Sequence, residues 1–310
     1  MEEYFTIEFY KGNGAILLNL VNTGSDGEMN SIRYYYWKNT IPNAARDNYT
    51  GTIVGGTGQV ADGSRINCNQ GDIIRLYRPE QTAIGNGLNN VNRFNGMSNC
   101  KVYGNLASLI GYTDVLPEKA FTIMFYYCMF TDCSGLYFPW TNVPKWAYRW
   151  MFYGCNQITK IPNISTAGPV TLGQEACHQM FRQCNALTKV DLDEWKITSA
   201  GNGAFQNLFF SCTGLNYVKC LDSNPASSIN KYNKWLYNVP ATGTFIKHPD
   251  ATWSSGTSGI PAGWTVKNMN PQVQSLDFND VNAVYVKGNI GISAIYGQNN
   301  QLLWSKNTNI

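Results

Sequence analysis

The chain of 310 residues has few charged side chains and no concentrated basic segment. Asp, Glu, Lys and Arg together make up 14% of it, whereas about a quarter is usual in a globular protein. The net charge is +3. Nucleic-acid binding needs a concentrated cationic face, so this composition argues against a nucleic-acid partner. No stretch reaches the roughly 18 apolar residues of a transmembrane helix, so we expect no membrane insertion.

Metal-binding and catalytic patterns are also missing. His178 and His248 are the only imidazoles, and no two cysteines have the CxxC spacing of a zinc site. The sequence has no nucleophile elbow and no phosphate-binding Gly-Lys-Ser/Thr loop, and the glycine cluster at 55–58 predicts a turn. We therefore expect no enzyme activity, no catalytic residues, no metal and no cofactor.

An acidic group at Asp191, Asp193 and Glu194 leaves two interpretations open. A calcium loop places oxygen ligands at alternating positions, and that alternation is incomplete here. A solvated strand end is therefore favoured over a calcium site.

One short phrase occurs four times in the sequence. It consists of Met-Phe or Leu-Phe, then a cysteine after two further residues, then Leu or Ile three residues after the cysteine. The steps between copies are 22, 29 and 28 residues. Periods of this length are typical of a solenoid whose repeats must stack to bury their apolar faces. The predicted core of the repeat consists of Phe130, Cys133, Leu136, Phe152, Cys155, Ile158, Phe181, Cys184, Leu187, Phe209, Cys212 and Leu215.

The residues around each copy predict its local structure. The segment before each cysteine is predicted as a helical turn, and the segment after it as a short strand. A degenerate fifth copy is expected at 236–239, 28 residues after Leu208. Segments 101–111 and 235–266 are expected to close the two ends, with Trp253 and Trp264 as seals.

The organisation predicted is mainly β with short helices. Residues 1–95 hold short strands separated by Gly/Asn turns, which favours an N-terminal β-sandwich. Residues 96–268 form the repeat domain with its caps. Residues 269–310 form a small C-terminal β module, which we expect to pack on a neighbouring domain or subunit.

The nine cysteines are an odd number, so they cannot form a complete disulfide framework. Leucine-rich repeats have a tight turn at which one side chain points into the core, and a small side chain such as cysteine fits there. We therefore expect a buried ladder of free thiols.

The segment 138–150 contains three tryptophans and is the best candidate for a binding surface. Flat aromatic faces at Trp140, Trp146 and Tyr148 would suit a sugar or a protein partner. The alternative is core packing, which the helical spacing of Trp146 and Trp150 favours for Trp150.

The repeat region resembles the BspA-like leucine-rich repeats common in gut Bacteroidetes and their phages. The resemblance is carried by the repeated phrases and by the closing stretch at 238–266, which ends in Gly-Trp-Thr-Val, and it covers a little over half of the chain. The tail at 295–304 is similar in style to short C-terminal strands of phage fibre and virion proteins. The start of the sequence, Met1-Glu2-Glu3-Tyr4-Phe5, has neither the basic region nor the continuous apolar region of a secretory signal, so lysis rather than secretion is the expected route of release.

These features together predict a non-enzymatic phage structural protein on the virion surface. It would be a head or tail fibre or a capsid decoration protein that assembles as a homo-oligomer with other virion proteins. Its expected role is adhesion to a glycan or protein of the host surface. The alternative is a bacterial cell-surface leucine-rich-repeat adhesin.

Overall fold

The computed structural model describes residues 3–22, 33–38, 51–54, 65–78, 90–269, 294–296 and 302–305. The chain divides into two compact units, 1–267 and 268–310. In the second unit the structure describes an antiparallel pair, β17 (Ala294–Tyr296) and β18 (Leu302–Ser305). The glycine cluster at 55–58 and most of the predicted C-terminal module lie outside the described residues.

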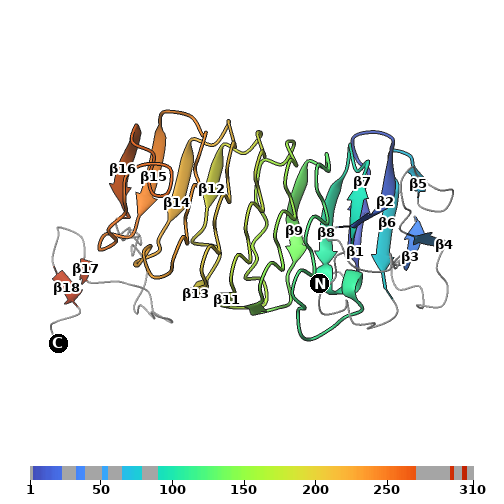
Figure 1. The fold of residues 1–310 in the computed structure, drawn as a ribbon, viewed down its shortest axis with the longest axis horizontal. Helices are drawn as coiled ribbons and strands as arrows, with labels where there is room; N and C mark the ends of the chain where they lie inside the picture. The colour runs from blue at the N-terminus through green and yellow to red at the C-terminus, as the bar shows by residue number, and fades with distance from the viewer. Residues whose placement is uncertain are drawn as a thin grey trace. The chain divides into compact units, whose positions relative to one another are not determined.

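The described residues form a mainly β structure with almost no helix. The helical element among them is a single 3-10 turn, η1 (Leu106–Ile110), capped by the Asn105 side chain and by Gly111 in the left-handed conformation. Within the first unit, strands and turns stack as a β-solenoid of about five turns (Figure 1).

Two sheets form the N-terminal part of the first unit. One has the strand order β4-β3-β6-β1-β8-β9 and the other the order β5-β2-β7. The strands of the first sheet are β4 (Gly51–Val54), β3 (Arg33–Lys38), β6 (Ile73–Tyr77), β1 (Phe5–Glu8), β8 (Lys101–Asn105) and β9 (Asp132–Tyr137). The strands of the second are β5 (Arg65–Cys68), β2 (Gly14–Asn22) and β7 (Asn90–Asn95).

The first sheet continues directly into the repeats. Strand β8 pairs antiparallel with β1 on one side and parallel with β9 on the other. A single hydrophobic core runs from Phe5 to Trp264. The N-terminal strands therefore cover the open end of the first rung and share its core.

Two parallel sheets follow along the repeats. In one, β12 (Lys189–Asp191), β14 (Tyr217–Cys220), β15 (Gly243–Lys247) and β16 (Trp264–Asn268) are neighbours in that order. In the other, β10 (Asn142–Val143), β11 (Val170–Leu172) and β13 (Ile197–Ala200) are neighbours. Strands β12, β14 and β15 pair in register, so Val190 lies beside Val218 and Val218 beside Phe245. Like side chains therefore stack on like along the core.

Each rung also contains a segment of successive four-residue turns, at 117–128, 144–155, 173–184, 201–212 and 228–239. We call these the turn segments. In the first four of them, alternate backbone N–H groups donate to the carbonyl three residues earlier, and the N–H groups between them donate to the next rung. The fifth has the first series of bonds, and its Lys234 N–H donates to Ser258 Oγ of the closing segment. Every fourth residue has φ between 49° and 72°. These residues are Lys119, Ile123, Tyr127, Trp146, Trp150, Gly154, Glu175, Gln179, Gln183, Gly203, Asn207, Ser211, Asn230, Lys234 and Asn238.

The predicted helical turn before each cysteine is therefore wrong. Neighbouring helix axes need about 8–10 Å, whereas the strands of successive rungs are about 4.8 Å apart. A helix in every rung would make the turn side wider than the strand side and bend the stack into an arc. The turn segments keep the strand spacing because half of their N–H groups point along the stack.

The hydrogen bonds also fix which phrase is the first copy. Phe125 N–H donates to Met151 O, and the Phe125 and Phe152 rings stack with their centroids 5.5 Å apart. Phe152 stacks on Phe181 at 5.4 Å, and Phe181 on Phe209 at 5.8 Å. The steps are thus 27, 29 and 28 residues, and the first copy is Met124-Phe125-x-x-Cys128.

Phe130 and Cys133 are fully buried but lie outside this series. Cys133 belongs to β9, and its thiol lies 3.7 Å from the carbonyl of Lys160. The short first step of 22 residues therefore arises from a second Met-Phe-x-x-Cys phrase five residues further along, and the first rung has an ordinary length. The remaining predicted core residues, from Leu136 to Leu215, are buried as well.

The cysteines of the stacked phrases form a hydrogen-bonded ladder. The thiols of Cys128, Cys155, Cys184 and Cys212 each donate to the carbonyl of the phenylalanine one rung earlier, at 3.0–3.2 Å. Those phenylalanines are Phe94, Phe125, Phe152 and Phe181. A thiol at this position fills the space beside the ring. It also adds a second hydrogen bond to carbonyls of Phe125, Phe152 and Phe181 that already accept a backbone N–H.

The fifth copy is shifted by one residue from its predicted alignment. Phe209 N–H donates to Trp235 O, which places Leu236, not the predicted Tyr237, opposite Phe209. Trp235 Nε1 donates to Gly259 O, and Trp264 Nε1 donates to Pro240 O. These indole bonds attach the closing segment to the last rung.

Candidate functional site

The outward side of the turn segments carries a ladder of rings and guanidinium groups, which we call the turn face. The residue directly after each stacked core position is Tyr126, Tyr153, Arg182, Phe210 or Tyr237. Tyr126 stacks on Tyr153 and Phe210 on Tyr237, with centroids 4.7 Å apart in both pairs.

Arginines complete this ladder. Arg182 lies 5.4 Å from the Tyr153 ring on one side and 4.2 Å from the Phe210 ring on the other. Arg93 of β7 lies 5.2 Å from the Tyr126 ring at the ladder's N-terminal end. The faces of the rings are occupied by neighbouring rings and guanidinium groups. The ladder therefore presents ring edges, phenol groups and guanidinium N–H groups to the solvent.

Three further cations surround Trp146 on the same face. Lys145 lies 4.3 Å, Lys119 5.1 Å and Arg149 5.2 Å from the Trp146 ring, and Arg149 also lies 4.2 Å from Trp150. Partial burial lowers the pKa of Arg149, and neighbouring Glu175 partly offsets that shift. Neither Lys119 nor Lys145 forms an ion pair with a described residue.

A chain of hydrogen bonds connects Trp146 to Arg182. Glu175 Oε2 accepts from Trp146 Nε1 at 3.0 Å and from His178 Nδ1 at 2.9 Å. Gln179 Nε2 donates to His178 Nε2 at 2.7 Å, and Arg182 Nη1 donates to Gln179 Oε1 at 3.0 Å. These partners define a neutral imidazole protonated on Nδ1.

The pKa shifts agree with this arrangement. Burial lowers the pKa of His178 and outweighs the opposing hydrogen bond to Glu175. For Glu175, burial acts to raise the pKa, but the bonds from His178 and Trp146 and the charge of Arg149 hold it below its ordinary value. The carboxylate is thus satisfied within the chain, while the cations around Trp146 stay available on the face.

The three residues predicted as a binding surface are separated by the turn geometry. Tyr148 is fully buried and Trp140 is 3% exposed. Trp140 Nε1 donates to Thr113 O, and the Tyr148 ring packs edge-on against Phe138. A period of four residues, rather than the helical 3.6, places Tyr148 in the same inward row as the core phenylalanines. Trp146 alone of the three is half-buried at the surface.

The other candidate groups have structural partners. Asp191 and Asp193 both lie close to Lys219 Nζ, at 3.3 Å and 3.1 Å, and Glu194 is exposed. All nine cysteines are buried free thiols. The part of the chain that the structure describes holds no group of three His, Cys, Asp or Glu side chains arranged for a metal ion.

Sequence reasoning missed the outer ladder, although a signal for it was present. The residue after each core phenylalanine is aromatic or arginine in every rung, but the pattern is visible only once the first copy is placed at Met124-Phe125. Comparisons with protein-family models, curated proteins and solved structures found no match to this chain. Among the described residues, no helix is long and apolar enough to span a membrane.

Proposed function

We propose that this chain is a non-enzymatic adhesive protein whose turn face binds an acidic glycan. The observation that carries the proposal is the set of cations aligned on that face: Arg93, Lys119, Lys145, Arg149 and Arg182. Carboxylate or sulfate groups of an extended glycan complement this charge, and guanidinium groups held flat by aromatic rings are suited to bind them.

The first three rungs contribute one or two of these cations each and β7 contributes Arg93, so each single contact is weak. A chain of acidic sugars laid along the stack would meet several of them at once, and several copies of the protein would add further contacts. Adhesion of this kind depends on a rigid, repetitive scaffold, which the continuous core provides.

We place this adhesive protein on the surface of a phage virion, as a head or tail fibre or a capsid decoration protein. The resemblance of the repeats to BspA-like sequences supports this assignment. We further propose that residues 1–95 form a β-sandwich that docks on the particle. Because its larger sheet continues into β9, a docked N-terminal part would hold the repeats rigidly outward.

Charge reversal on the turn face should weaken binding to an acidic polymer. The double variant Lys119→Glu/Lys145→Glu places two negative charges beside Trp146, and we expect binding to sulfated dextran to weaken by about tenfold or more. Surface plasmon resonance at low and at physiological salt measures the loss.

The matched control is Lys160→Glu/Lys196→Glu, which changes the net charge by the same amount at exposed positions outside the turn segments. This control should keep most of the binding. Equal losses in the two variants would mean that net charge, not the turn face, drives binding, and would refute the proposed site.

The virion assignment is tested separately by mass spectrometry of purified particles. Particles released from a host that carries the gene should contain this polypeptide in many copies. Its absence from them, together with its recovery on the host cell surface, would instead support the bacterial adhesin.

A further inference from the structure

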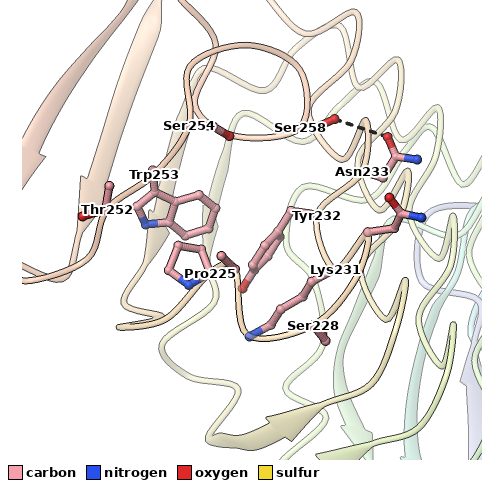
Figure 2. Close-up of a pocket in the computed structure, with 11 residues that line it drawn as sticks. Pro225, Ser228, Lys231, Tyr232, Asn233, Thr252, Trp253, Ser254 and Ser258 are labelled. Carbon is pink, nitrogen blue, oxygen red and sulfur yellow. Dashed lines mark hydrogen bonds between the residues drawn. The ribbon is translucent and has the colours of Figure 1, made fainter.

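A pocket of about 340 Å³ lies at the C-terminal end of the repeats, away from the cations of the turn face. It lies between the fifth turn segment and the loop that follows Ala251 (Figure 2). Its volume is at the lower end of the roughly 300–1,000 Å³ of small-molecule sites. The lining includes Lys231, Tyr232, Asn233, Trp253 and Ser258.

One side of the pocket is aromatic and held in place by the core. The Trp253 ring lies 4.8 Å from Tyr232 and stacks on Trp235 at 5.6 Å with an interplanar angle of 17°. Trp253 Nε1 is shielded from solvent, so the indole offers the pocket its ring rather than its N–H. Figure 2 shows the Trp253 and Tyr232 rings close together beside Pro225.

The loop across the pocket is fixed as well. Ser258 Oγ donates to Asn233 Oδ1 at 3.3 Å and accepts from Lys234 N–H at 3.1 Å. Gly256 N–H donates to Ile260 O at 2.7 Å. The pocket is therefore preformed, which reduces the entropy that a ligand must overcome on binding.

The single charged side chain of the pocket lining, Lys231, is neutralised by an ion pair. Lys231 Nζ lies 2.6 Å from Asp222 Oδ2 and donates to Ser227 Oγ at 3.1 Å. Tyr232 OH also donates to Asp222 Oδ2, at 2.8 Å. The one cation of the lining is thus neutralised by a carboxylate behind it, and the pocket has no charge left for an ionic ligand.

Several neutral hydrogen-bonding groups remain for a ligand. The side chains of Asn230, Thr252 and Ser254 form no hydrogen bond with a described residue. An amide and two hydroxyl groups next to an aromatic ring match a molecule that has hydroxyl groups on its rim and C–H groups on its face.

We propose that this pocket binds one or two units of a neutral saccharide. The sugar's C–H face would lie against the Trp253 and Tyr232 side, and its hydroxyl groups would exchange hydrogen bonds with Asn230, Thr252 and Ser254. The pocket is a second binding site with a chemistry different from that of the turn face, and it functions whether or not the turn face binds an acidic glycan.

The test titrates the whole protein with glucose, galactose and N-acetylglucosamine, each at millimolar concentrations, and follows saturation-transfer NMR and tryptophan fluorescence. We expect saturable binding of at least one sugar with a dissociation constant in the millimolar range, as for a small, open site. Ala226→Trp fills the pocket from an exposed lining position and should abolish the signal.

Ser223→Trp adds the same ring at an exposed position outside the lining and should bind like the wild type. The variant Lys119→Glu/Lys145→Glu should also keep sugar binding, so failure of this proposal and failure of the turn-face proposal can be told apart. Thermal melts confirm that each variant is folded. No saturable binding to the wild type, or equal binding by Ala226→Trp, would overturn the proposal.

Discussion

Raising the pH from about 8.5 to about 10 under reducing conditions should unfold this protein, because all nine of its thiols are buried in the folded state. Burial raises the pKa of each of them, to about 11 for Cys220 and to about 12 for Cys68 and Cys212. The unfolded chain exposes the same thiols at their ordinary pKa of about 8.5.

The sign follows from proton binding. Below about pH 8.5 both states keep their thiols protonated, so the stabilising contribution is fully present. As the pH rises, the unfolded chain loses protons that the folded chain retains, and stability falls. One thiol contributes about 1.4 kcal/mol per pH unit, so nine of them lower the free energy of unfolding by about 10–15 kcal/mol over this range, which is comparable to the whole stability of a typical domain.

Urea unfolding at a series of pH values, monitored by circular dichroism, measures this dependence. The variant Cys184→Ala/Cys212→Ala removes two of the titrating groups and should flatten the slope by about 3 kcal/mol per pH unit, although its stability at neutral pH is lower. A free energy of unfolding that stays constant between pH 8.5 and 10 would show that the thiols are not buried as described.

Truncating a ring in the middle of the phenylalanine stack should produce the largest effect of any single substitution. Phe152 is fully buried between Phe125 and Phe181. Phe152→Ala removes contacts with both neighbouring rungs and leaves a cavity, and we expect a loss of about 3–5 kcal/mol. The midpoint of thermal unfolding should fall by about 5–9 °C.

The matched control is Phe210→Ala, one position outside the stack in a later rung, where the side chain is half-buried. It loses contacts with Tyr237 and Arg182 but opens no closed cavity, so about 1 kcal/mol is expected. Equal destabilisation by the two variants would contradict the assignment of the phenylalanine stack as the centre of the core.

Much of this architecture could be predicted from the sequence. The spacing of Phe, Cys and Leu predicts a stack of rungs with buried thiols, because only stacking buries an apolar face that recurs every 27–29 residues. The side chains that form the core, and the length of the repeat, can therefore be predicted without a structure.

The register of the first rung could not be read in the same way. Residues 124–133 contain two consecutive candidates, Met124-Phe125-x-x-Cys128 and Met129-Phe130-x-x-Cys133, with the same chemistry. Composition cannot choose between them. The choice is made by the backbone, through the hydrogen bond from Phe125 N–H to Met151 O.

The candidate site was predictable only in part, for a related reason. Trp146 is on the surface and Tyr148 in the core because the turn segments repeat every four residues, a period that pattern analysis takes for a helix. The outer ladder depends on the same period and on the correct register. Aromatic content alone therefore locates the right segment but selects the wrong side chains.

The register of the first rung is the central claim, and a disulfide cross-link tests it most directly. The Cα atoms of in-register neighbours in adjacent rungs are about 4.8 Å apart. This distance lies within the range of roughly 4.4–6.8 Å between the Cα atoms of two disulfide-bonded cysteines. The variant Tyr126→Cys/Tyr153→Cys should therefore cross-link under mild oxidation, as the stacking of these two rings indicates. In the alternative register Thr131 would take the place of Tyr126, so Thr131→Cys/Tyr153→Cys should stay reduced. Peptide mapping by mass spectrometry identifies the linked pair, and a 131–153 link with no 126–153 link would contradict this description of the fold.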